Sequence, residues 1–245
     1  AVGILTEIDQ NMSPYKSASE ISRINQKAFH EPQLISRETF DLIRTSVGFF
    51  WRSGGAFDIT ALPLLKLWGF YQGEPQVPGL EKVLRTLAHV GSCFLVLDEE
   101  KSSVGFLRPW MGLELGGIGK GYACDRVVGH LKSRGVPGAL VNVGGNIFAY
   151  GKAPSGAPWR VGLRDPRNSA GVSAEIDLAE EAVSTSGDYD NYFIWEGRRF
   201  PHLLDPRTGF PVSGSVAALF RASSRCREER ALSRSRGSRP LPRHT

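Results

Sequence analysis

Apolar residues spaced for one face of a helix recur through much of the chain. Val2, Leu5, Ile8 and Met12 predict a first helix, because neighbours three to four residues apart share a face. Ser19 to Asn25 follows as a short helical turn after a loop. The same spacing predicts further helices, and these cover residues 37–53, a proline-started segment before Leu67, residues 80–89 and the stretch from Cys124 to Arg134.

Short runs of apolar and alternating residues predict strands between and after these helices. They cover residues 94–97, 103–107, 139–143, 159–163, 172–178, 182–186 and 192–195. Strands and helices do not alternate strictly, so the pattern predicts an α+β fold rather than a doubly wound parallel sheet. One large domain or two closely packed lobes both fit this length, and we assign residues 1–220 to one domain.

Charge is distributed unevenly along the chain. The whole sequence carries +5, but residues 221–245 contain eight arginines and two acids, which leaves −1 on residues 1–220. A nearly neutral folded part argues against a nucleic-acid partner, because such a role would rest on the tail alone. We expect the arginine- and serine-rich tail to be disordered.

Other features of the composition limit the class of protein but do not identify its cellular compartment. With 41% hydrophobic and 22% charged residues, the sequence is typical of a globular protein. No apolar run reaches the length of a membrane span, and the residues from Ala1 onward do not read as a signal peptide. The three cysteines form neither a metal-site spacing nor an even disulfide set.

A glycine-rich stretch within residues 113–146 is the first candidate for chemistry. Four glycines precede the helix, at positions 116, 117, 119 and 121. The pattern is no phosphate loop, because Gly121 follows Lys120, and no dinucleotide fingerprint, because Tyr122 stands where the third glycine should be. Glycine amides beside a helix N-terminus and Lys120 suit an anion such as a pyrophosphate, although a tight strand-to-helix turn explains them equally well. Asp125 is either an acid that complements the helix dipole or a ligand contact.

Two further stretches are rich in small polar groups. Residues 184–189 end a predicted strand with hydroxyls, and residues 201–209 place His202, Asp205 and Arg207 around a turn. By themselves these residues favour a β-turn with proline at its second position and a structural histidine.

Several motifs in a fixed order make the sequence resemble a known family, the bacterial FAD:protein FMN transferases or ApbE family. The motifs are Met12-Ser13-x-Tyr15, Ser19-Glu20-Ile21-Ser22-Arg23-Ile24-Asn25, Phe57-Asp58-Ile59-Thr60, Leu67-Trp68-Gly69-Phe70, Gly116-Gly117-Ile118-Gly119-Lys120-Gly121-Tyr122-Ala123-x-Asp125, Asn142-x-Gly144-Gly145-Asn146, Thr185-Ser186-Gly187-Asp188-Tyr189 and His202-x-x-Asp205-Pro206-x-Thr208-Gly209-x-Pro211. They extend from Met12 to Val212. The resemblance implies an ApbE-like, T-fold-like α+β architecture of mixed sheets with packed helices in one large domain.

The resemblance also implies a site and a reaction. FMN would pass from FAD to a threonine or serine of an acceptor protein through a phosphoester bond, with Mg²⁺ as cofactor and AMP as the second product. The FAD-binding residues would be Ser13, Tyr15, Gly117, Lys120, Asp125, Asn146, Ser186 and His202. Tyr15 would contact the isoalloxazine, Asp125 the adenosine side, and the Gly119 carbonyl the metal. His202 is the candidate proton acceptor.

A partner and a location follow from the same resemblance. The acceptor would be a flavoprotein subunit of a membrane redox complex. The protein would work in the bacterial periplasm or cell envelope, and an inner-membrane lipoprotein is one form that the resemblance allows for the full-length protein. The oligomeric state stays open.

The sequence departs from the family pattern at both ends. The opening strand with its Met-Gly-Thr motif does not precede Ala1, and after Val212 we find neither the expected strand nor the Ala-Asp-x-x-x-Thr segment that supplies the side-chain metal ligands. A frameshift or a natural basic tail would each give this composition. We therefore expect weak binding of FAD and magnesium, and keep two alternatives to the transferase: an FAD pyrophosphatase giving FMN and AMP, and an inactive flavin-binding remnant.

Overall fold

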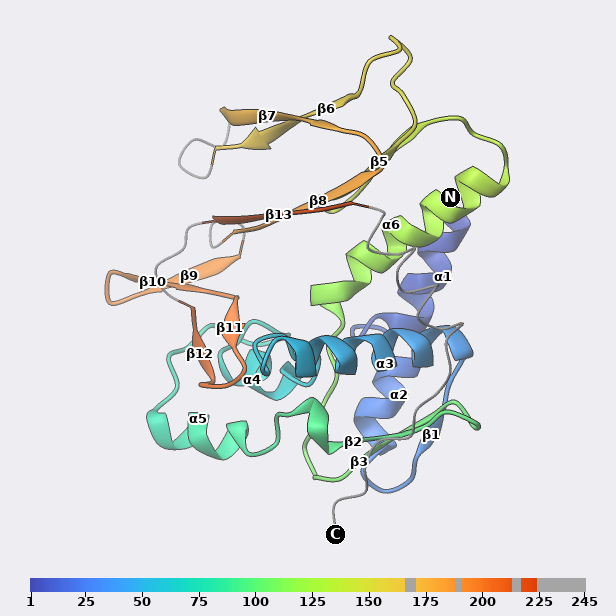
Figure 1. The fold of residues 1–245 in the computed structure, drawn as a ribbon. Coiled ribbons are helices and arrows are strands. Elements are labelled where there is room, and N and C mark those ends of the chain that lie inside the picture. Colours follow the sequence, from blue (N-terminus) through green and yellow to red (C-terminus); the bar gives the residue numbers. More distant parts are fainter. Residues whose placement is uncertain (166–170, 188–190, 213–216, 224–245) are drawn as a thin grey trace.

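A computed structural model describes residues 1–165, 171–187, 191–212 and 217–223, the last of these as backbone (Figure 1). The predicted disorder of the tail from residue 224 onward lies outside the described residues. The described part is a mixture of helices and small antiparallel sheets.

The first helices pack on a small antiparallel sheet and form the largest core. The elements are α1 (Val2–Met12), α2 (Glu20–Lys27), α3 (Arg37–Arg52), the 3-10 helix η1 (Ser92–Phe94) and the sheet β1 (Gln33–Leu34), β3 (Ser103–Phe106) and β2 (Leu95–Asp98) in that spatial order. Ser19 and Ser36 cap α2 and α3 by accepting backbone N–H groups, which satisfies donors that a helix start leaves open. Ile21, Phe40 and Ile43 are fully buried, as the helical spacing requires.

Two short helices and two small hairpins form a second region. The helices are α4 (Leu62–Leu67) and α5 (Leu80–Leu87), and the hairpins are β9 (Tyr192–Trp195) with β10 (Arg198–Pro201) and β11 (Leu204–Asp205) with β12 (Phe210–Pro211). Trp68, at the end of α4, is 1% exposed and donates its indole N–H to the Gly209 carbonyl at 2.9 Å. This contact joins the α4 segment to the β11–β12 turn.

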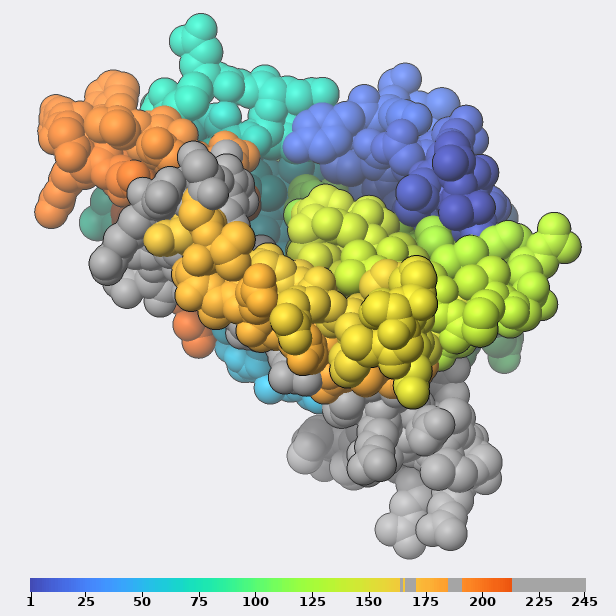
Figure 2. Space-filling model, turned by 90° about the horizontal axis from the view of Figure 1, so that it is seen from above, coloured from blue at the N-terminus to red at the C-terminus, as the bar shows by residue number. Residues whose placement is uncertain are grey.

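A layered region completes the fold. Helix α6 (Gly116–Ser133) packs on the sheet β13 (Ala217–Ser223), β8 (Glu181–Gly187), β5 (Asn146–Tyr150) and β4 (Ala139–Val143). The hairpin β6 (Trp159–Arg164) with β7 (Val172–Leu178) forms a second cluster with the same sheet. Figure 2 shows the β9–β10 hairpin, in orange, projecting at one end of the molecule and the green segment of α6 towards the other.

Most predicted helices and strands are present, and the α+β fold class is confirmed by the solved structures compared below. Gly135, at φ +74, ends α6 as the C-cap pattern predicts. The strands β1, β5 and β10 to β12 were not predicted.

Two expectations about the chain were wrong. The four glycines do not form a loop before a helix, because α6 begins at Gly116 and includes all of them. The expectation that no strand follows Val212 also fails, because β13 pairs antiparallel with β8 over residues 217–223. Strand pairing depends on backbone groups, whereas the prediction relied on family motifs and apolar periodicity. β13 thus takes in the first three residues of the stretch we assigned to the tail. The division at residue 220 is otherwise still a prediction.

Candidate functional site

The glycines of α6 allow close approach at the start of the helix. A Cβ on Gly116 would lie 2.6 Å from Glu114 Oε1, and a Cβ on Gly117 would lie 3.1 Å from the Phe57 ring. The Gly116 N–H donates to Glu114 Oε1 at 2.7 Å. The Glu114 carboxylate therefore already accepts the Gly116 amide, one of the glycine amides that we expected to face an anion.

Glu114 is a candidate that the sequence prediction missed. Its backbone N–H donates to the Ile59 carbonyl at 2.8 Å, which fixes the carboxylate beside the start of α6. Burial raises the pKa of this carboxyl, while the Gly116 hydrogen bond and the charge of Lys120 oppose the rise. The one available signal was an acid between Leu113 and Leu115, both of which are buried.

Tyr15 stacks on Tyr71, with ring centroids 4.8 Å apart and an interplanar angle of 24°. Tyr71 donates its hydroxyl to the Pro14 carbonyl, and burial with the charge of Glu114 raises the pKa of Tyr15. Tyr15 is 58% exposed, so much of its surface is open to a planar ligand. Ser13 accepts the Tyr15 N–H at 3.3 Å and thereby shapes this turn.

Lys120 connects α6 to the turn between β4 and β5. Its Nζ donates to the Gly144 carbonyl at 3.4 Å. Gly144 and Gly145 have φ +55 and +87, and they join paired residues Val143 and Asn146 in a tight hairpin turn that suits glycine. Lys120 therefore links the glycines of α6 to the glycine turn between β4 and β5.

His202 follows the last residue of β10. Its backbone N–H and its ring Nδ1 lie 3.0 and 2.9 Å from the Asn191 carbonyl oxygen. Its ring meets Phe70 edge to face at a centroid distance of 6.5 Å. Phe70 and Tyr71 are neighbours in sequence, so one segment contacts both His202, through Phe70, and Tyr15, through Tyr71.

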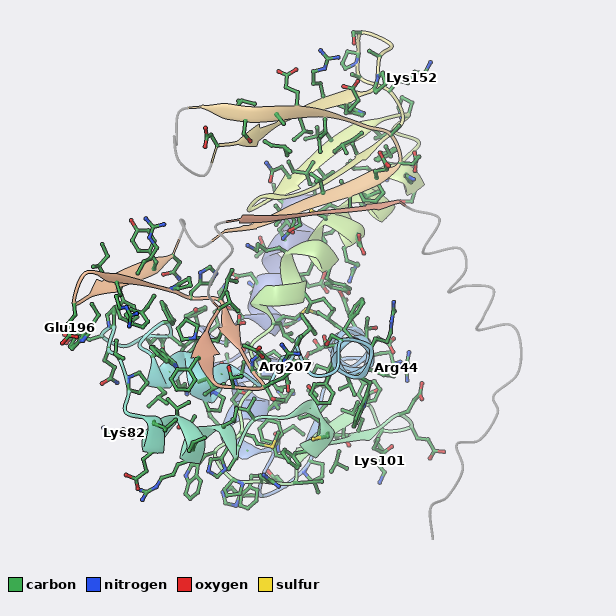
Figure 3. The ribbon with its side chains drawn as sticks, turned by 60° about the vertical axis from the view of Figure 1, so that its left-hand side comes forward. Arg44, Lys82, Lys101, Lys152, Glu196 and Arg207 are labelled. Atoms are coloured by element: carbon green, nitrogen blue, oxygen red, sulfur yellow. The ribbon has the colours of Figure 1, made fainter. Side chains whose placement is uncertain are left out.

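The other polar groups of the C-terminal motif make a structural turn, as the sequence favoured. Asp205 accepts the Arg207 guanidinium N–H groups at 2.9 and 2.7 Å, and this bond is the main cause that lowers the pKa of Asp205. Gly209 has φ +77, and a Cβ there would lie 2.7 Å from Val83 Cγ1. Figure 3 shows Glu196 at the tip of the β9–β10 hairpin and Arg207 closer to the body of the molecule.

The Phe57-to-Thr60 motif contains a half-buried hydrogen-bond centre, the Asp58 carboxylate. Asp58 Oδ1 accepts the Thr60 N–H, the Thr60 hydroxyl and the Ser92 hydroxyl at 2.9, 2.7 and 2.6 Å. Asp58 Oδ2 accepts the Ser92 N–H at 3.1 Å, and the Thr60 hydroxyl accepts the Gly91 N–H at 2.7 Å. The motif therefore holds the segment that presents Ile59 to Glu114.

The comparison with protein families decides the identity. A model described as ApbE family matches residues 1–226. The chain belongs to the ApbE family.

Similar curated proteins are named FAD:protein FMN transferase, and similar solved structures are named ApbE. An FAD:protein FMN transferase of Vibrio cholerae is 33% identical over 88% of this chain and 65% of its own length, and that of Escherichia coli K12 is 32% identical over 86% and 62%. The chain thus spans somewhat less than two thirds of these relatives. The crystal structure of the ApbE protein from Thermotoga maritima matches with TM-score 0.84 and 33% identity, covering 91% of this chain and 72% of that one. The apo flavinyl transferase ApbE of Pseudomonas stutzeri matches with TM-score 0.81 and 34% identity, covering 92% and 71%.

The remaining site predictions for this ApbE-family chain stay predictions. Asp125 lies half-buried on α6, and Asn146 opens β5, where its carbonyl accepts the Cys124 thiol. The backbone of Ser186 pairs in β8, and its side chain lies outside the described residues. Gly119 is inside α6, so its carbonyl also serves the helix.

Proposed function

We propose that this protein transfers the FMN part of FAD to a hydroxyl of an acceptor protein and releases AMP. The observation that supports this proposal is the arrangement at the start of α6. The exposed Tyr15 ring, the half-buried Glu114 carboxylate and Lys120 all belong to this region, and the positions of Gly119 and Gly121 have open space where a side chain would be. Membership of the ApbE family makes FAD the natural ligand to test.

FAD enters this proposal as the substrate, and each candidate residue has a task suited to its chemistry. Tyr15 offers its exposed face to the isoalloxazine, since aromatic rings favour stacking. Lys120, beside the α6 amides, offsets phosphate charge. Asp125 contacts the adenosine half. The other proposed contacts are Ser13, Gly117, Asn146 and Ser186.

The reaction is a substitution at phosphorus. The threonine or serine hydroxyl oxygen of the acceptor bonds to the phosphorus on the FMN side, and the bond from that phosphorus to the AMP oxygen breaks. AMP leaves with the electron pair, and His202 takes the proton of the attacking hydroxyl. FMN is then held to the acceptor by a phosphoester bond.

Magnesium dependence is part of the proposal, although the described residues do not by themselves fit a magnesium site. In the described ranges no three His, Cys, Asp or Glu side chains group closely enough to hold a metal. Mg²⁺ prefers oxygen ligands and commonly takes several from substrate phosphates and water. The Gly119 carbonyl is the backbone ligand that we propose.

A second candidate is a flavin-binding protein without turnover, which the missing carboxylate cluster in the described part favours. Bound flavin without AMP release would identify it. Hydrolysis of FAD to FMN and AMP would use the same residues with water in place of the acceptor hydroxyl.

For partner and location, we propose a flavoprotein subunit of a membrane redox complex as the acceptor, reached in the bacterial periplasm or cell envelope. Among the described residues no helix has the length and apolar character to cross a membrane.

The test combines the chain, FAD, magnesium and a candidate acceptor, and measures the acceptor mass and AMP together. A mass gain equal to one FMN moiety with equimolar AMP supports transfer. AMP and FMN without an acceptor adduct indicate the pyrophosphatase. If neither an adduct nor AMP forms but flavin fluorescence is quenched, the protein binds flavin without turnover.

A further inference from the structure

The ring of His202 is fixed at the base of the β9–β10 hairpin. Its backbone N–H extends the strand pairing by donating to the Asn191 carbonyl at 3.0 Å. Its Nδ1 lies 2.9 Å from the same oxygen. One carbonyl thus receives both groups and sets the direction of the ring.

This contact decides which ring nitrogen carries the proton. A carbonyl oxygen can only accept, so Nδ1 must be the donor. A neutral imidazole has one N–H, and its other nitrogen then has the free lone pair. In His202 that nitrogen is Nε2.

The Phe70 ring also contacts the His202 ring. Its ring meets the His202 ring at an interplanar angle of 69° and packs against Phe193 at a centroid distance of 5.4 Å. Phe193 in turn stacks on Phe200 at 5.4 Å and 14°. The contact is therefore backed by a packed aromatic cluster.

We propose that the Asn191 carbonyl and the Phe70 ring position His202 as its Nδ1–H tautomer, with Nε2 as the proton acceptor. Phe70 is thus a positioning residue that acts through His202. The catalytic use of Nε2 rests on the proposed function, whereas the tautomer and its dependence on Phe70 do not.

The direct test is the nitrogen spectrum of the imidazoles in chain labelled with ¹⁵N-histidine, at a pH where the rings are neutral. The chain has five histidines, and His202→Gln identifies the signals that belong to position 202. We expect a protonated-type shift at Nδ1 and an unprotonated-type shift at Nε2. The reverse pattern in the folded wild-type chain would overturn the proposal, whatever the transfer activity.

A variant pair tests the role of Phe70. Phe70→Leu should lower kcat by about twofold to tenfold, because the loss of one aromatic contact lowers the population of the correctly oriented His202 ring by about that factor. The KM for FAD should be unchanged. The nitrogen shifts of this variant should move towards a mixture of tautomers, and Phe70→Tyr should restore both readings. The control is Phe29→Leu, which removes an aromatic contact with His30 outside this cluster and should leave the His202 shifts in place.

The outcomes separate this inference from the proposed function. If Phe70→Leu folds and leaves shifts and kcat unchanged, Phe70 does not position the histidine. If the chain shows no transfer, the spectra of wild type and variants still decide the tautomer. Should Phe70→Leu fail to fold, the wild-type spectrum still tests the tautomer, and Phe70→Met tests the role of the Phe70 ring by the same nitrogen shifts.

Discussion

Asp58 should be among the most sensitive acids in the chain, although we do not expect it to touch a ligand. Its two oxygens accept four hydrogen bonds, all from Thr60 and Ser92. These two residues are 0% and 2% exposed and Asp58 itself is half-buried, so the donors left behind have little access to water. Asp58→Ala removes every one of these acceptors at once.

The expected cost follows from the donors left behind. A buried donor without a partner costs about 1–3 kcal/mol, and the two hydroxyls can rotate towards other acceptors while the two backbone N–H groups cannot. We therefore expect Asp58→Ala to lower the free energy of unfolding by about 3–5 kcal/mol. Against a typical total of about 5–15 kcal/mol, the loss is large.

A second variant, Asp58→Asn, should give a smaller loss for the same reason. Asp58→Asn keeps one oxygen and replaces the other by an NH₂ group. That group must face either the Ser92 N–H or the three donors at Oδ1, so one contact or more becomes donor against donor. The loss should be about 1–2 kcal/mol, smaller than for alanine.

Urea unfolding, followed by circular dichroism with the slope of the transition compared between variants, measures these losses. The control is Asp98→Ala, which removes an acid whose side chain is 38% exposed and which accepts the Lys101 N–H. It should change the free energy of unfolding by less than about 1 kcal/mol. A loss below about 1 kcal/mol for Asp58→Ala, or equal losses at both positions, would refute the reasoning.

Three other outcomes are expected. His202→Ala should lower transfer by roughly 10² to 10⁴ with FAD affinity nearly unchanged, measured by AMP release and flavin fluorescence; a parallel fall in both would make the residue structural. Asp125→Ala should weaken FAD more than FMN in competition titrations, because only FAD has the adenosine, and equal weakening would contradict that placement. Burial raises the pKa of Tyr122 to about 12, so an ultraviolet titration should show a late tyrosinate step that Tyr122→Phe removes. The folded state then holds this proton longer than the unfolded state does, and stability should fall as pH rises from the ordinary value of 10.0 through about 12.

Helical spacing predicted the first half of the fold well because its apolar stripes are long. Phe40 and Ile43 lie on one predicted stripe of α3, and both are fully buried. The strands that were missed are short or begin at a turn: β11 and β12 have two residues each, and β5 follows Gly145 directly. A two-residue strand has no period that a sequence pattern could reveal.

The glycine stretch shows why local preference failed at the site. Glycine weakens an isolated helix, so four glycines predicted a loop before Cys124. In the fold, Gly116 and Gly117 lie against Glu114 and Phe57, where a side chain would need its neighbours to shift. Tertiary packing therefore outweighs the propensity, and sequence alone could not place those neighbours.

In the candidate site, buried residues fix the positions of other residues, whose side chains are more exposed. Tyr15, which is 58% exposed, reaches the site through the Tyr71 hydroxyl bond to the Pro14 carbonyl. Glu114 is fixed through Ile59, which is 2% exposed and held beside the Asp58 network. In each case a contact between segments far apart in sequence fixes a residue of the candidate site. Substitutions at the buried anchors should therefore affect stability and binding together, whereas those at the exposed ends should affect binding or turnover alone, and this difference separates a structural role from a chemical one.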